Sequence, residues 1–173
     1  MRPTRLSTVM VAATVALFSR SAPLRAQDTA VGVNVGFASA VGFGGVTLTR
    51  SLFERARLEI GGGLGYSGWQ LSVMPKLVLG EGRARFVAGA GVAVAWPADS
   101  RVASGHPVWL NVDLLGMEYR FDSGFAIFNS AGVTVGLGGG EICVPPDGCE
   151  PQFLRNVNDY WSPQVRAGVA YWF

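Results

Sequence analysis

Eight charged residues occur at alternating positions along this chain, and they are its residues with the greatest capacity for chemistry. Arginine and lysine side chains can pair with carboxylates or line a narrow pore. Around them the same alternating rows hold mostly glycine, serine and threonine. The eight are Arg57, Glu59, Lys76, Arg85, Asp113, Glu118, Arg120 and Arg166. Because an unpaired charge is very costly inside a protein, we expect them to form ion pairs if their shared face is enclosed.

The chain has a single histidine, His106, and the polar stretch around it also contains Ser104 and Asp99. These residue types could supply the base and the nucleophile of a hydrolase that acts on lipid. Such residues also occur together by chance in polar loops, and His106 lacks the further ligands that a metal site needs. We therefore predict no catalytic residue, no metal site and no cofactor.

Cys143 and Cys149 are the two cysteines of the chain. They bracket the sequence VPPDG, in which Pro146, Asp147 and Gly148 favour a tight turn. Exported proteins meet an oxidising compartment, where neighbouring cysteines are oxidised. We expect a disulfide between the two.

The first 26 residues have the pattern of a cleaved secretory signal peptide. Arg2 and Arg5 precede an apolar stretch, Leu6–Phe18, that is too short to span a bilayer as a helix. We place the cleavage after Ala26, which leaves one domain at residues 27–173. Cleavage removes four of the 14 basic residues and none of the 12 acidic ones, so the net charge changes from +2 to −2. No basic surface remains for binding nucleic acid.

Residues 27–173 alternate between apolar and small or polar side chains with the period of two that predicts β-strands. In the sixth strand the apolar row shifts by one residue, which predicts a β-bulge near Leu114–Leu115. In the seventh, Phe128 and Asn129 break the pattern. The eight predicted strands are Ala30–Ser39, Gly45–Leu52, Ala56–Tyr66, Trp69–Leu79, Arg83–Trp96, Val108–Phe121, Phe125–Leu137 and a last one over Arg166–Phe173.

The connections and the sense of the alternation predict an all-β fold, an eight-stranded antiparallel up-and-down transmembrane β-barrel. The second, fourth and sixth strands end in minimal turns, whereas Pro97–Pro107 and roughly residues 138–160 are long polar loops. An eight-stranded barrel has interior room only for side chains, and the small and charged rows fit there. The rows of valine, leucine and phenylalanine then face lipid. We expect the charged residues to plug the lumen.

Aromatic residues gather near the predicted strand ends, which is typical of the girdles at the two surfaces of a bilayer. We predict one girdle at the long-loop end and another at the tight-turn end. Their members are Tyr66, Trp69, Trp96, Trp109 and Trp161 at the first end and Trp172 at the second.

Residues 27–173 resemble the small eight-stranded, porin-like outer-membrane barrels of Gram-negative bacteria. The signal peptide, the eight strands and the closing sequence RAGVAYWF carry this resemblance. In that family the barrel-assembly machinery recognises the last strand. The resemblance implies that Arg166, Gly168, Tyr171 and Phe173 form such an assembly signal. It also implies export to the periplasm and insertion among the lipids of the bacterial outer membrane.

The sequence thus predicts a non-enzymatic outer-membrane protein with structural or binding roles for its surface loops. The extracellular ligand is not indicated. A narrow channel for small solutes, a lipid-modifying enzyme and a soluble periplasmic barrel are the alternatives.

Overall fold

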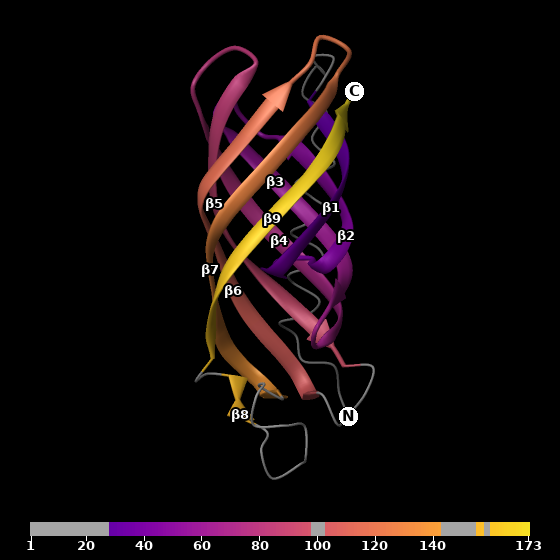
Figure 1. Ribbon diagram of the computed structural model, residues 1–173, viewed down its shortest axis with the longest axis vertical. Helices are drawn as coiled ribbons and strands as arrows, with labels where there is room; N and C mark the ends of the chain where they lie inside the picture. The colour runs from indigo at the N-terminus through magenta and orange to yellow at the C-terminus, as the bar shows by residue number, and fades with distance from the viewer. Residues whose placement is uncertain (1–27, 98–102, 143–154, 158–159) are drawn as a thin grey trace.

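The computed structural model describes residues 28–97, 103–142, 155–157 and 160–173 (Figure 1). Three predictions lie outside these residues: the signal peptide at 1–26, the disulfide between Cys143 and Cys149, and the position of Asp99. The side chain of Ser104 is also outside the described part. In the described ranges, no helix is long and apolar enough to cross a membrane.

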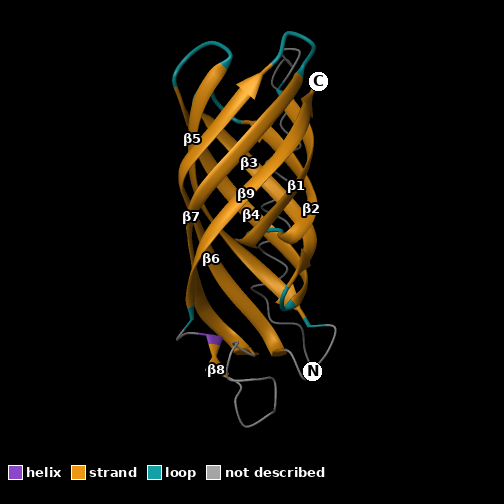
Figure 2. Ribbon diagram, in the orientation of Figure 1, coloured by secondary structure: helices purple, strands orange, loops and turns teal. Residues whose placement is uncertain are grey.

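The predicted all-β fold is confirmed, because eight antiparallel strands close into a barrel (Figure 2). Each strand pairs with its neighbour in the chain, and β1 closes the barrel against β9. A two-residue strand, β8 (Arg155–Asn156), pairs only with the end of β7. The barrel strands are β1 (Thr29–Ser39), β2 (Gly42–Ser51), β3 (Ala56–Gly65), β4 (Gly68–Leu79), β5 (Ala84–Trp96), β6 (Ala103–Arg120), β7 (Phe125–Ile142) and β9 (Trp161–Trp172).

The barrel wall is uneven in height. β1 to β4 have 10 to 12 residues each, whereas β6 and β7 have 18. In Figure 1, β6 and β7 extend past the neighbouring strands at the end opposite the C-terminus. The predicted loops around residues 97–107 and 138–160 are therefore shorter than expected, because both of these strands continue into them. We call this the loop end, and the other the turn end.

The β-bulge predicted in the sixth strand is confirmed. Asp113 pairs with Gly132 and Leu115 pairs with Ala131, so Leu114 is an extra residue on β6. Leu114 and Leu115 are consecutive and both exposed, at 61% and 74%. The bulge keeps Asn111, Asp113, Gly116, Glu118 and Arg120 on one face of β6.

The alternation places polar side chains inside the barrel and apolar side chains outside. Among the described residues, thirty large apolar or aromatic side chains are exposed, and 25 of them lie in the eight strands, where they form the outer rows. The other five lie just beyond strand ends: Leu52, Phe53, Tyr66, Phe121 and Phe173. Of the described residues, 17 polar or charged ones are buried. They include Arg57 and Glu59 on β3 and Lys76 on β4. On those outer rows, Arg50 and Asn129 are rare polar residues. This distribution is the reverse of the one in a water-soluble domain.

The break in the seventh predicted strand has a packing explanation. Asn129 is exposed on the outer face, and Phe128 lies on the inner face of β7. Phe128 pairs with Gly168 of β9, and a Cβ atom placed on Gly168 would lie 2.6 Å from the Phe128 ring. The same Cβ atom would lie 2.5 Å from the backbone oxygen of Val33, so the β1 backbone and the Phe128 ring together leave room only for a glycine.

Candidate functional site in the barrel interior

The charged side chains form two clusters along the barrel axis. The first lies toward the turn end and contains Arg57, Glu118 and Arg120. Arg57 Nη1 donates to Glu118 Oε2 at 2.9 Å, and Arg120 Nε donates to Glu118 Oε1 at 2.8 Å. The indole of Trp172 stacks on both cations, with its centroid 4.7 Å from Arg57 Cζ and 3.4 Å from Arg120 Cζ. We name these four residues the turn-side cluster.

The second group, which we name the central cluster, contains Glu59, Lys76, Asp113 and Arg166. Glu59 accepts from Lys76 Nζ and from Arg166 Nη1, each at 2.6 Å. Arg166 Nη2 also donates to Asp113 Oδ2 at 3.0 Å. All four are buried, and their formal charges cancel. Four strands contribute one side chain each, so the cluster joins β3, β4, β6 and β9 across the lumen.

The two clusters contain seven of the eight charged residues predicted from sequence to pair. Arg85 is the exception. It is half-buried, and its Nε donates to the carbonyl oxygen of Gly82 at 2.8 Å. Arg85 joins no ion pair within the part of the chain that the structure describes. It lies near the turn after β4, and its guanidinium bonds to the backbone of that turn.

The prediction of an aromatic girdle is wrong for two residues, Trp172 and Trp109. Trp172 is 2% exposed and lies inside the barrel against the turn-side cluster. Trp109 is 6% exposed and packs edge-on against Tyr160, with 5.7 Å between ring centroids. Both stand on the inward rows of their strands, so neither faces the outside. The other four, Tyr66, Trp69, Trp96 and Trp161, are exposed at the loop end, and their place in a girdle stays a prediction.

The residues of the closing sequence divide between the two faces of β9. Arg166 is buried in the central cluster, and Gly168 accommodates Phe128. Tyr171 and Phe173 are exposed on the outer face, at 54% and 58%.

Uncharged polar side chains continue the interior from the central cluster toward the loop end. Gln164 Nε2 donates to Asp113 Oδ1 at 2.8 Å. The hydroxyl of Thr134 lies 3.1 Å from Gln164 Oε1 and 2.9 Å from Asn111 Oδ1, and it donates to the carbonyl oxygen of Ala38. This chain of contacts ties the turn between β1 and β2 to β6, β7 and β9.

That turn folds into the barrel. Ala40 and Val41 are buried, and Val41 lies against Gly61 of β3. Ala38, the second-last residue of β1, has a φ of 50°. A residue other than glycine rarely adopts this left-handed conformation, which costs about 1–2 kcal/mol. The hydrogen bond from Thr134 and the burial of Val41 hold it in place.

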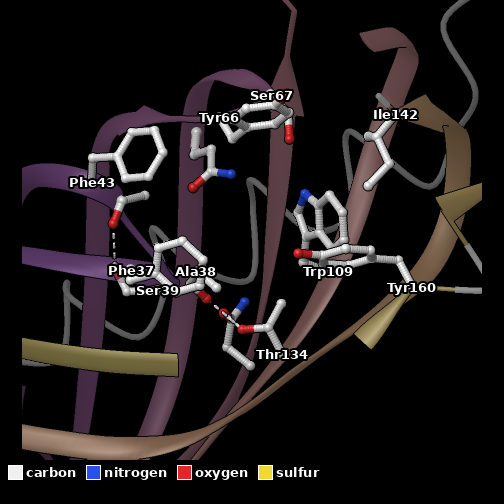
Figure 3. A pocket seen from close by; sticks show the side chains of 13 residues that line it. Phe37, Ala38, Ser39, Phe43, Tyr66, Ser67, Trp109, Thr134, Ile142 and Tyr160 are labelled. Atoms are coloured by element: carbon white, nitrogen blue, oxygen red, sulfur yellow. Dashed lines mark hydrogen bonds between the residues drawn. The ribbon is translucent and has the colours of Figure 1, made fainter. Parts of the chain in front are cut away.

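A cavity of about 170 Å³ lies at the loop end, above this turn (Figure 3). We name it the mouth cavity. One side of it comes from the end of β1, the start of β2 and the turn after β3, and the other side comes from β6 and β7. Its lining holds aromatic, apolar and neutral polar residues, with no charged residue in the described part of the chain: Phe37, Ala38, Ser39, Gly42, Phe43, Tyr66, Ser67, Gln70, Trp109, Asn111, Thr134, Ile142 and Tyr160.

Comparisons of the chain with protein-family models, with curated proteins and with solved structures found no match. The geometry of the chain itself therefore carries the functional argument.

Of the residues considered for catalysis, only the side chain of His106 lies in the described part of the chain. His106 is exposed, and its ring lies 6.2 Å from that of Trp96. In the described ranges, no group of three or more histidine, cysteine, aspartate or glutamate side chains could hold a metal ion.

The mouth cavity was missed by sequence reasoning. Most of its residues lie in strands that the alternation did predict, but they come from strands and turns far apart in the sequence and meet only once the barrel closes. One signal was present: Trp109 has the same parity as Asn111 and Asp113, which the sequence had already placed on the polar face.

Proposed function

We propose that residues 27–173 form a bacterial outer-membrane β-barrel that does not conduct, with a lumen plugged by ion pairs and surface loops that serve structural or binding roles. The observation that carries this proposal is the inverted distribution of side chains. An apolar outer surface around a charged interior is stable only where the surroundings of the barrel are apolar.

The dimensions of the barrel agree with a bilayer. β1 to β4 have 10 to 12 residues, and a tilted strand needs about 9–11 residues to cross the hydrocarbon core. Exposed charged side chains flank this apolar band, because Glu54, Glu81 and Asp122 lie in the three turns at the turn end. At the loop end, the exposed aromatic residues stand where a girdle is expected.

The plug follows from the central cluster. The attraction between two opposite charges offsets the cost of removing water from them only when their geometry is good. Glu59 has such geometry with Lys76 and Arg166. The cavity among these charged side chains measures only about 40 Å³, which is room for a few water molecules. The interior of such a barrel is filled by its own side chains.

Fractionation of the producing bacterium tests the location. We expect the protein in the outer-membrane fraction and its release only by detergent, with export through the signal peptide and insertion by the barrel-assembly machinery. Recovery in the soluble periplasm without detergent would contradict the proposal and favour a soluble barrel.

A further inference from the structure

Asn129 is a polar residue on the apolar outer face of the barrel. It is exposed on β7, between Ile127 and Ala131 on the same outer row, and its partners on the neighbouring strands are Met117 and Ala167. None of these four side chains can donate a hydrogen bond, and only the weakly accepting thioether of Met117 can receive one. Within the described part of the chain, the Asn129 amide makes no hydrogen bond.

This amide lies at the depth of the hydrocarbon core if the barrel is inserted as proposed above. Phe125 and its partner Tyr171 are exposed aromatic residues at the turn end, and Asn129 follows Phe125 by four residues. Four residues of a strand tilted by about 45° cover about 10 Å of an apolar band that is about 25 Å tall. Arg50, near the end of β2, has a long side chain that can reach the lipid headgroups, whereas an asparagine side chain is too short.

A second copy of the chain supplies what the Asn129 amide lacks. Hydrocarbon offers neither donors nor acceptors, so an amide exposed to lipid carries a free-energy cost. Two amides satisfy each other, because each both donates and accepts, and polar side chains join membrane-spanning segments in this way. Barrels inserted by one route share one orientation, so a two-fold axis between them is parallel to the bilayer normal. Such an axis brings each Asn129 to its counterpart at the same depth.

The surroundings of Asn129 suit the approach of a second barrel. β6, β7 and β9 lie side by side, with β7 in the middle (Figure 1). On the β6 side Leu115 is 74% exposed, and on the β9 side Ala167 is small. A two-fold axis at β7 sets the β6 side of each barrel against the β9 side of the other. Small residues let the two backbones approach closely enough for the amides to meet.

We propose that the outer face of β6, β7 and β9 around Asn129 is the interface of a homodimer within the membrane, in which the Asn129 amides of the two copies hydrogen-bond to each other. This proposal rests on the proposed outer-membrane location, because in water the amide would bond to solvent.

Sedimentation equilibrium of the full mature protein, folded in density-matched detergent, measures the dimer. Asn129→Leu removes the amide and leaves the outer face apolar, whereas Asn129→Gln keeps an amide. Leu115→Ala removes the exposed side chain on the β6 side of the interface. Leu77→Ala is its matched control, because Leu77 is 59% exposed on the outer face of β4, away from the interface. Circular dichroism verifies that each variant is folded.

We expect a monomer–dimer equilibrium for the wild-type protein. The dimer should be about ten-fold weaker in Asn129→Leu, through loss of the hydrogen bonds between the copies. It should also be weaker in Leu115→Ala and close to the wild type in Asn129→Gln and Leu77→Ala. Equal dimerisation of the wild type and Asn129→Leu would overturn the proposal, as would equal losses in Leu115→Ala and Leu77→Ala.

Flotation of the wild-type protein with lipid vesicles separates this proposal from the one on which it rests. A barrel that floats with the vesicles but sediments as a monomer overturns the homodimer alone. A barrel that does not float overturns both the outer-membrane location and the homodimer.

Discussion

Glu59 holds two cations at once, and this makes it the most sensitive residue of the interior. Its two carboxylate oxygens accept separately from Lys76 and Arg166 at 2.6 Å. Without that carboxylate, Asp113 alone would remain to face two buried positive charges. Breaking a buried pair costs more than the pair contributes, since the partner stays desolvated.

We therefore predict that Glu59→Gln lowers the free energy of unfolding by roughly 3–5 kcal/mol. Urea unfolding of the detergent-folded protein, followed by tryptophan fluorescence, measures it. Glu81→Gln is the matched control, because Glu81 is exposed in the turn after β4. Equal midpoints for the two variants would show that the central cluster does not stabilise the barrel.

Trp172 has a comparable role in the turn-side cluster. Arg57 and Arg120 share the single carboxylate of Glu118, so one positive charge is left over, and the indole ring lies against both guanidinium groups. A desolvated cation–π contact contributes about 2 kcal/mol.

We predict that Trp172→Leu destabilises the barrel by about 2 kcal/mol or more, through the lost ring contacts. Trp161→Leu, at the exposed start of the same strand, should change the stability far less. The same unfolding assay compares them. A larger loss in Trp161→Leu would contradict the inward role of Trp172.

The alternation of the strands predicts correctly which way these two tryptophans point. The residue type alone led to the wrong prediction. Trp172 has the parity of Arg166, and Trp109 has the parity of Asp113, so both belong to the inner rows. The expectation that tryptophan marks a bilayer surface placed them outside. The actual ion pairs were beyond sequence reasoning, because partners such as Arg57 and Glu118 are 61 residues apart and meet only once the barrel closes.

At the scale of elements, the bulge in β6 keeps the two clusters on one face. Asp113, before the bulge, belongs to the central cluster, and Glu118, after it, belongs to the turn-side cluster. The two residues are an odd number apart, so a regular strand would point them to opposite faces of the sheet. The extra residue, Leu114, corrects this difference.

Deletion of Leu114 should therefore be tolerated, because it gives a regular strand that leaves Asp113 and Glu118 inside. Deletion of Leu110 is the matched control. It lies before Asp113 on the same outer row, and its loss forces either Trp109 or Asp113 to the outer face. We predict a folded barrel for the first and loss of the fold for the second, as judged by circular dichroism and protease resistance. Failure of both would mean that the bulge itself is needed.

The heights of the strands were less predictable than their number. Eight strands followed from alternation, whereas β6 and β7 continue into stretches rich in glycine and serine, where the apolar period fades. The pattern gives no signal there because that part of the wall stands above the apolar band, where neither face needs uniform apolar residues. Of the mouth-cavity residues on β6 and β7, only Ile142 lies in this added height, and the cavity was missed because its residues meet only once the barrel closes.

At the scale of the whole molecule, the barrel wall and its contents have separate tasks. Eight strands satisfy the backbone hydrogen bonds by closure, and the two clusters and the inward turn after β1 lie inside the barrel. Under the proposed plug, a continuous water path would have to pass both clusters and the side chain of Val41, which is fully buried.

We therefore predict that the purified, folded protein shows no discrete current steps in a planar lipid bilayer. Flotation of protein-containing vesicles verifies insertion of the same preparation, so that silence is not mistaken for absence of protein. The ion pairs are buried, so raising the salt concentration should screen them little and should not open the barrel. Discrete openings of the wild-type protein at moderate salt would contradict the plug and favour the channel for small solutes. The Glu59→Gln variant further distinguishes a plugged lumen from a channel. If the lumen is plugged, weakening the central cluster should produce current steps that the wild-type protein does not show.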